Sequence, residues 1–309
     1  MRFPVTNVAD PRLAPYAALG DPARLAREGR FVAEGRLVLQ RLVAAGSYDI
    51  DSVVVSPAAA AQLAEALDRL DPAVPVYVAP TALLEQLTGF NIHRGCLALV
   101  RRPVMRSLEE LLPPRTLPAL LVVLERVANP DNVGGVFRNA LAFGASAVLV
   151  DPATADPLYR KAIRTSMAAT LAVPWSRCAD WPGDLARLAA AGLDVVALVT
   201  DLDAPPLGGA GAPPPADLGG RAAEPARDDA TGAPASGSNP VASRRANPVP
   251  RIALLVGHEG DGLSAPALAH AARRVRIPMA PGADSLNAAT ATGIALYHFA
   301  HACGTISSA

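Results

Sequence analysis

Strand-like runs recur through the second half of the chain, and stretches with helical periodicity lie between most of them. The runs are ALLVVLERV (119–127), SAVLVD (146–151), DVVALVT (194–200), RIALLVG (251–257) and RRVRIPM (273–279). The helical stretches are VGGVFRNALAF (133–143), PGDLARLAAA (182–191), APALAHAA (265–272) and SLNAATATGIALYHFAHA (285–302). Mostly apolar strands that alternate with helices are typical of a parallel sheet covered on both faces. Residues 117–309 are therefore predicted to form an α/β domain.

A smaller α/β pattern precedes this region. Its predicted helices are FVAEGRLVLQRLVAAG (31–46), AAAAQLAEALDRL (58–70) and TALLEQLTG (81–89), and its predicted strands are IDSVVVS (50–56), VPVYVA (74–79) and RGCLALVRR (94–102). The Pro113-Pro114 pair indicates a linker after this unit. Since 309 residues suffice for about two domains, the chain is divided into 1–112 and 117–309.

One segment of the second domain does not follow the alternation. Residues 204–250 consist mainly of Pro, Gly, Ala and Ser and contain almost no large apolar side chain. Such a segment cannot offset the entropy lost on ordering, so it is predicted to be a disordered surface insertion between two strands.

The composition argues against several classes of protein. Basic and acidic residues balance at 28 each, whereas a strong nucleic-acid binder often has a basic excess. No apolar run reaches the roughly 18 residues of a membrane span, and the first residues lack the pattern of a secretory signal. The three cysteines show neither a disulfide framework nor the spacing of metal ligands. A cytoplasmic protein without a metal is expected.

Three segments rich in glycine and asparagine or serine follow predicted strands. In NPDNVGGVFR (129–138), Asp131 or Asn132 could cap a helix whose glycines allow close packing, but a cap does not explain Arg138. The segment also lacks the G-x-G-x-x-G pattern of a dinucleotide site. Because open α/β sheets bind ligands at the carboxyl ends of their strands, a crevice is expected there.

The other two segments carry further polar candidates. In LLVGHEGDGLS (254–264), Glu259 is either a solvated loop charge or an acceptor for a hydroxyl or amino group. In IPMAPGADSLNAATATGIALYHFA (277–300), Ser285 and Asn287 are predicted to point toward the crevice, while helix capping by Asp284 or Ser285 is the simpler alternative.

Taken together and in this order, the three segments resemble the motifs of the SpoU/TrmH branch of the SPOUT RNA methyltransferases. DPLYRKAIRTSMAATLAVPW (156–175) also matches the pattern of that family. The first domain is similar to the small ribosomal-protein-like RNA-binding domain often fused in front of it. Two positions depart from the common pattern: His258 replaces a small polar residue, and Ala168 stands where glycine is frequent.

This resemblance implies a trefoil-knot catalytic domain, a homodimer and S-adenosyl-L-methionine as cofactor, with RNA (rRNA or tRNA) as the substrate. The implied reaction is methyl transfer to a ribose 2′-hydroxyl. By position, the residues implied to bind the cofactor are Thr200, Leu255, Gly257, Ile277, Met279 and Leu286.

The residues implied to be catalytic are Asn132, Arg138, Glu259, Ser285 and Asn287. Arg138 is the residue usually assigned to activate the hydroxyl, although a guanidinium hardly deprotonates in a protein. It could instead clamp the neighbouring phosphate and orient the hydroxyl. A non-catalytic RNA-binding or assembly protein, or a methyltransferase that acts on a base, are the alternative functions.

Several basic residues are candidate contacts to RNA phosphates, although each alone could simply be a solvated surface charge. They are Arg101, Arg102, Arg160, Lys161 and Arg164. If they contact phosphates, RNA binding should weaken steeply as the salt concentration rises.

Overall fold

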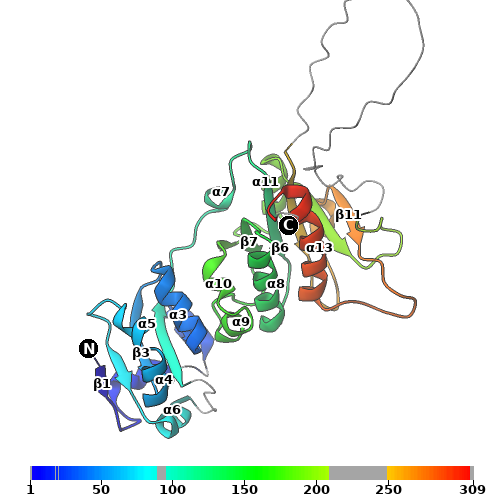
Figure 1. Ribbon diagram of the computed structural model, residues 1–309. Helices are drawn as coiled ribbons and strands as arrows, with labels where there is room; N and C mark the ends of the chain where they lie inside the picture. The colour runs from blue at the N-terminus through cyan, green and yellow to red at the C-terminus, as the bar shows by residue number, and fades with distance from the viewer. Residues whose placement is uncertain (1, 18, 20, 89–94, 209–248, 307–309) are drawn as a thin grey trace, which may run out of the picture.

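The chain folds around two β-sheets that lie toward opposite ends of the molecule (Figure 1). The computed structural model describes residues 2–17, 19, 21–88, 95–208 and 249–306. Within these residues, no helix is both long enough and apolar enough to cross a membrane. Each sheet is accompanied by helices, so the predicted α/β class is observed in both parts of the chain.

The N-terminal sheet is mixed. Its strands follow the order β1-β4-β3-β5-β2, in which β1, β4 and β3 run parallel and β5 is antiparallel to both β3 and β2. The strands are β1 (Arg2–Pro4), β2 (Arg30–Glu34), β3 (Ile50–Val55), β4 (Val76–Val78) and β5 (Cys96–Arg101). The helical elements are η1 (Pro11–Leu13), α1 (Ala14–Ala17), α2 (Pro22–Arg27), α3 (Arg36–Ala45), α4 (Pro57–Gln62), α5 (Ala64–Asp68) and α6 (Thr81–Thr88).

The prediction of one helix over 31–46 is wrong at its start. Residues Arg30–Glu34 form the edge strand β2, which pairs with β5 through Phe31 and Val32. Gly35 then adopts φ +112°, a conformation that favours glycine, and α3 begins at Arg36. Short apolar runs fit a strand and a helix equally well, so periodicity alone could not separate the two elements.

The C-terminal sheet has six strands, all parallel, in the order β11-β9-β10-β6-β7-β8. The strands are β6 (Ala119–Leu124), β7 (Ala147–Val150), β8 (Trp175–Arg177), β9 (Asp194–Val199), β10 (Arg251–Val256) and β11 (Arg273–Arg276). The helices are α7 (Leu108–Leu111), α8 (Pro130–Ala142), α9 (Arg160–Thr165), α10 (Ala169–Ala172), α11 (Gly183–Ala190), α12 (Ala265–Ala269) and α13 (Ala288–Cys303). The predicted parallel sheet is confirmed, with β8 as an additional edge strand.

Both faces of this sheet are buried. Alternate residues of β6 show the division: Leu120 and Val122 pack in the cluster that includes α8, α10 and α13, while Leu121 and Val123 pack with α7, α11 and α12. Since side chains of a strand alternate between faces, helices on both sides require a strand that is apolar throughout. This requirement explains the continuous run ALLVVL.

The first residues of the predicted insertion belong to the folded domain. The Leu207 backbone N–H donates to the Arg276 carbonyl at 2.7 Å, and the Arg276 Nε donates to the Ala204 carbonyl at 3.0 Å. The segment 204–208 therefore extends the β11 edge of the sheet. The predicted disorder of 209–248 falls outside the described residues.

Replacing 209–248 with a short Gly-Ser linker should leave the melting temperature of the protein nearly unchanged, because the hydrogen bonds to Arg276 are kept. A matched deletion that also removes 204–208 should lower it, because those bonds are lost. Thermal unfolding followed by circular dichroism compares both variants with the full chain. An equal drop for both deletions would show that 209–248 itself stabilises the domain.

Candidate functional site

Three loops at the carboxyl edge of the C-terminal sheet surround a cavity of about 270 Å³. They comprise residues 198–201 at the end of β9, 256–263 at the end of β10 and 277–286 after β11. Neighbouring parallel strands end at the same edge, so the sequence places these loops together. Five of the six predicted cofactor residues line the cavity: Thr200, Gly257, Ile277, Met279 and Leu286.

Leu255, the sixth predicted cofactor residue, does not line the cavity. Its side chain is fully buried on the face of the sheet that packs against α11 and α12. The next residue, Val256, lines the cavity instead, because successive strand residues point to opposite faces.

A chain of hydrogen bonds joins the three motif segments at the rim of this cavity. The Asn287 Nδ2 donates to the Asn132 Oδ1 at 2.7 Å, and the Asn132 Nδ2 donates to the Glu259 Oε1 at 2.6 Å. Asn132 is buried, with 6% of its surface exposed, while Glu259 and Asn287 are exposed. The structure therefore brings together three of the five predicted catalytic residues, from positions up to 155 residues apart.

The direction of this chain is set by the start of α13. The Asn287 Oδ1 accepts from the backbone N–H groups of Ala289 and Thr290, so its amide nitrogen is left to donate to Asn132. Each amide accepts on one side and donates on the other, and the Glu259 carboxylate is the final acceptor. Among the described residues, the Glu259 Oε2 has no hydrogen-bond partner, which leaves it available to a ligand.

The helix caps differ from those predicted. Asn129 caps α8, with its Oδ1 accepting from the Asp131 N–H, and Asn287 caps α13. The alternatives Asp131, Asn132, Asp284 and Ser285 were therefore wrong as caps. Asn132 is consequently free to bond across the site.

Ser285 and Arg138 stand apart from the hydrogen-bonded chain. Ser285 lines the cavity and makes no side-chain hydrogen bond within the described part of the protein. Arg138 is exposed on α8, does not line the cavity, and has no hydrogen-bond or ion-pair partner among the described residues. Leu141, three residues further along the same helix, is also 45% exposed, so this side of α8 is not buried against the domain. A single copy of the chain therefore does not direct Arg138 at the cavity.

Close packing of α8 explains its two glycines. A Cβ on Gly134 would lie 2.6 Å from the Ala162 carbonyl oxygen of α9, and one on Gly135 would lie 2.6 Å from the Ala289 Cβ of α13. The Asn139 Nδ2 donates to the Ala289 carbonyl at 2.7 Å in the same contact. The glycines thus bring Asn132 within reach of α13, in agreement with the predicted packing role.

The end of β6 supports the 257–264 loop through residues that sequence reasoning did not single out. Glu125 is 1% exposed, and its carboxylate accepts from the Ser264 N–H at 2.7 Å and the Ser264 Oγ at 2.6 Å. Arg126 follows with φ +56° and donates to the Gly262 carbonyl at 3.2 Å. The two consecutive charged residues, Glu125 and Arg126, directly follow an apolar strand, and this pattern could have identified them from the sequence.

The two departures from the family pattern have local explanations. The His258 Nδ1 accepts from the N–H groups of Gly260 and Asp261, both at 3.0 Å, so the imidazole closes its own turn. Ala168 has φ +69°, which is the left-handed conformation that glycine adopts more easily. His258 also lines the cavity, whereas Ala168 does not.

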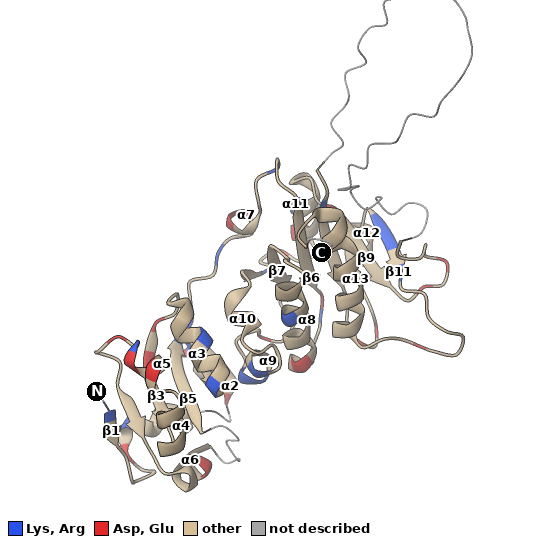
Figure 2. Ribbon diagram, viewed as in Figure 1, with Lys and Arg blue, Asp and Glu red and all other residues tan. Residues whose placement is uncertain are grey.

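All five predicted RNA-contacting residues have carboxylate partners. Figure 2 colours the basic and acidic residues along the ribbon, and blue segments of basic residues lie on α9. Arg101 pairs with Asp51 within the N-terminal domain. Arg102 pairs with Asp156, while Arg160 and Arg164 both pair with Glu34, so these three pairs connect the parts of the chain that form the two sheets. Lys161 pairs with Asp131 at 2.8 Å, and its ammonium holds the pKa of that carboxyl below the usual value.

The composition of the cavity indicates what it can hold. Apolar side chains from each loop line it, together with three carboxylates (Asp201, Glu259 and Asp261) and one cation, Arg274. Such a lining suits a ligand with an apolar planar part and positive charge. Among the described residues, no cluster of His, Cys, Asp and Glu side chains could bind a metal ion.

Comparisons with known proteins identify related sequences and similar folds. The model of the SpoU rRNA Methylase family matches residues 119–297. An uncharacterized tRNA/rRNA methyltransferase of Mycobacterium bovis is 35% identical over 299 residues, which cover 95% of this chain and 90% of the relative. The structure of an rRNA methyltransferase from Sinorhizobium meliloti with S-adenosylmethionine bound superposes with a TM-score of 0.71 at 24% identity, covering 96% of this chain and 97% of the other. The structure of an RNA 2′-O ribose methyltransferase gives a TM-score of 0.70 at 26% identity, covering 97% and 99%.

Proposed function

The chain belongs to the SpoU rRNA methylase family and is an RNA methyltransferase, and from this premise we propose that it methylates a ribose 2′-hydroxyl of a structured RNA. The observation that carries the proposal is the chain of hydrogen bonds from Asn287 through Asn132 to Glu259 at the rim of a cavity. A ribose hydroxyl needs a fixed acceptor close to the methyl donor, and the free Glu259 Oε2 is such an acceptor. The proposed place of action is the cytoplasm.

The cofactor is S-adenosyl-L-methionine, and the lining of the cavity fits it. Ile277, Met279 and Leu286 offer apolar contacts to an adenine ring. The carboxylates of Asp201 and Asp261 suit the cofactor's sulfonium and amino charges. When bound, the cofactor supplies a methyl group on a good leaving group. We also propose that these loops form the trefoil knot that the family resemblance implies.

The residues of the chain then have distinct tasks. Glu259 accepts a hydrogen bond from the RNA, and Asn132 and Asn287 hold its carboxylate in place. Ser285 is available to bond the ribose. Orientation of the hydroxyl is the main contribution required, because a positioned nucleophile can gain several orders of magnitude in rate.

The proposed active form is a homodimer. Arg138 lies on an exposed surface of α8, and the large side chains exposed on α8 and α13 include Leu141, Ile294 and Tyr297, at 45%, 41% and 56% exposure. A second copy packed on these helices would bury the apolar side chains and could bring Arg138 to the partner's cavity. There, the guanidinium would clamp a phosphate next to the reacting ribose.

Two measurements test the proposed function. Calorimetry of the full chain with S-adenosylmethionine should show binding, and its absence would remove the enzymatic proposal in favour of a non-catalytic RNA-binding protein. Methylation mapping of total RNA from cells with and without the gene should reveal a ribose 2′-O-methyl group that depends on it. A methyl group found on a base instead would overturn the ribose assignment while leaving the chain a methyltransferase.

A further inference from the structure

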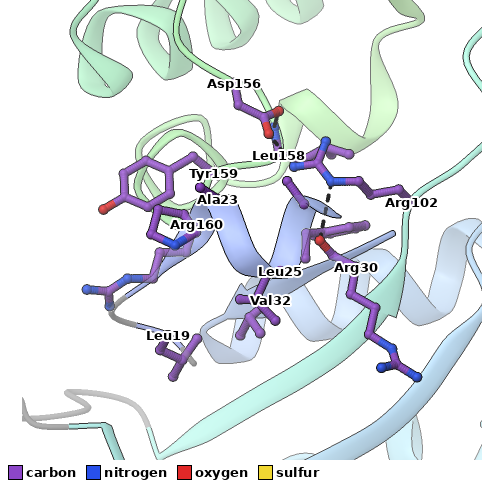
Figure 3. A pocket seen from close by; sticks show the side chains of 13 residues that line it. Leu19, Ala23, Leu25, Arg30, Val32, Arg102, Asp156, Leu158, Tyr159 and Arg160 are labelled. Atoms are coloured by element: carbon purple, nitrogen blue, oxygen red, sulfur yellow. Dashed lines mark hydrogen bonds and ion pairs between the residues drawn. The ribbon is translucent and has the colours of Figure 1, made fainter. Parts of the chain in front are cut away.

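A second cavity, of about 280 Å³, lies between the two domains (Figure 3). One wall comes from α2 and β2 of the N-terminal domain, and the other comes from residues 156–160, which lead into α9. Its floor contains the buried side chains of Leu25, Val32 and Leu158, at 5%, 3% and 1% exposure. It shares no lining residue with the cavity assigned to the cofactor.

The rim of this cavity is polar and aromatic. Arg102 pairs with Asp156 at one side and also donates to the Arg30 carbonyl at 3.2 Å. Tyr159 and Arg160 form another part of the rim, as Figure 3 shows. An apolar floor with an aromatic ring, guanidinium groups and a carboxylate is the combination that proteins use for a splayed-out base, which is stacked on a ring or guanidinium and bonded at its edge.

Basic side chains, each paired with a carboxylate, continue from the rim toward the proposed catalytic residues. Lys161 and Arg164, on the first turns of α9, keep 43% and 51% of their side chains exposed. Lys161 pairs with Asp131, the residue directly before Asn132. One short helix therefore separates the interdomain cavity from the hydrogen-bonded chain, and its cations lie where RNA phosphates between the two places would run.

We infer that the interdomain cavity binds an unpaired base of the RNA substrate, near the nucleotide that is methylated. The volume lies just under the ~300 Å³ at which pockets for drug-sized molecules begin, which suits one nucleoside. A base held there would fix the RNA against both domains. The inference rests on the proposed function, because it requires RNA as the substrate.

Zero-length ultraviolet cross-linking tests this site. The probe is total RNA from cells that lack the gene, incubated with the full chain and S-adenosylmethionine, and the RNA-linked peptides are identified by mass spectrometry. Adducts on Tyr159 or Leu158 are expected. Ala26→Trp, which fills the cavity, should remove them and weaken RNA binding roughly tenfold, in line with the loss of one stacked base. Cofactor affinity should not change.

Two controls keep this result specific. Ala61→Trp places the same bulk on an exposed position of α4, outside the cavity, and should keep both the adducts and the affinity. Tyr159→Phe should retain RNA binding and Tyr159→Ala should weaken it. The conclusion then does not depend on whether the Ala26→Trp variant folds. Adducts confined to other regions while methylation persists would overturn the base site and leave the proposed function standing. Failure of the wild-type chain to bind S-adenosylmethionine or to methylate RNA would overturn both.

Discussion

Replacing Arg138 with alanine is expected to lower the rate of methyl transfer by roughly a hundredfold to a thousandfold, as loss of one charge-stabilising group does in other enzymes. The affinity for S-adenosylmethionine should remain unchanged, because Arg138 does not line the cavity of its own copy and is proposed to bind an RNA phosphate, not the cofactor, in the partner's site. The fold should also be unaffected, because the side chain is exposed and has no partner among the described residues. Single-turnover kinetics and calorimetry measure the two quantities separately.

Arg138→Lys tests the kind of contact that the guanidinium makes. Lysine keeps the charge but cannot bind a phosphate through two parallel hydrogen bonds, so it should recover only part of the rate. Loss of cofactor affinity equal to the loss of rate in Arg138→Ala would mean that Arg138 has a structural role.

Mixing two inactive variants shows which copy Arg138 serves. If Arg138 of one copy completes the cavity of the other, a mixed dimer of Arg138→Ala with Glu259→Ala contains one intact site. Random exchange of subunits should then restore about a quarter of the wild-type activity per dimer, since half of the dimers are mixed and each has one working site of two. Activity no greater than that of the separate variants would mean that both residues act within one copy.

The positions of the loops could be predicted from the sequence because parallel strands end at a common edge. The apolar runs 119–127 and 251–257 required burial on both faces, and this placed Asn132 and Glu259, which follow them, at one end of the sheet. The hydrogen bonds between these loops were not predictable in detail. They depend on how close α8 comes to α13, which Gly135 and Ala289 determine.

Charge partners and helix ends were harder to predict, for different reasons. Arg160 and Glu34 are 126 residues apart, so their pairing depends on how the two domains meet. The cap of α8 was predictable in principle: Pro130 favours the first helical position, which makes Asn129 the cap. The direction of Arg138 depends on the rotation of α8 about its axis, which the mixed polarity of its sequence did not define.

Replacing Asn132 with aspartate should destabilise the protein in a pH-dependent way. The new carboxylate would lie at the 2.6 Å contact with Glu259 and could no longer donate there. Two carboxylates at this distance disfavour each other's ionisation, so the pKa of the pair rises above its unfolded value of about 4. A carboxyl with a raised folded-state pKa contributes stability at low pH that is lost as the pH rises through that pKa. The deficit relative to wild type should therefore be small near pH 4 and reach about 1–3 kcal/mol at neutral pH, because position 132 is buried while water screens the exposed Glu259 carboxylate.

Urea unfolding of both proteins across this pH range measures the deficit. Asn129→Asp is the matched control, because it makes the same substitution on the same helix at an exposed cap position, where aspartate is as good a cap as asparagine. The control should follow the wild-type curve. Methyl transfer by Asn132→Asp should fall with its stability and also below the level that folding alone explains, because the displaced Glu259 can no longer orient a hydroxyl. A deficit of equal size at every pH would show that Asn132 acts through packing, and the electrostatic role of its amide next to Glu259 would then be wrong.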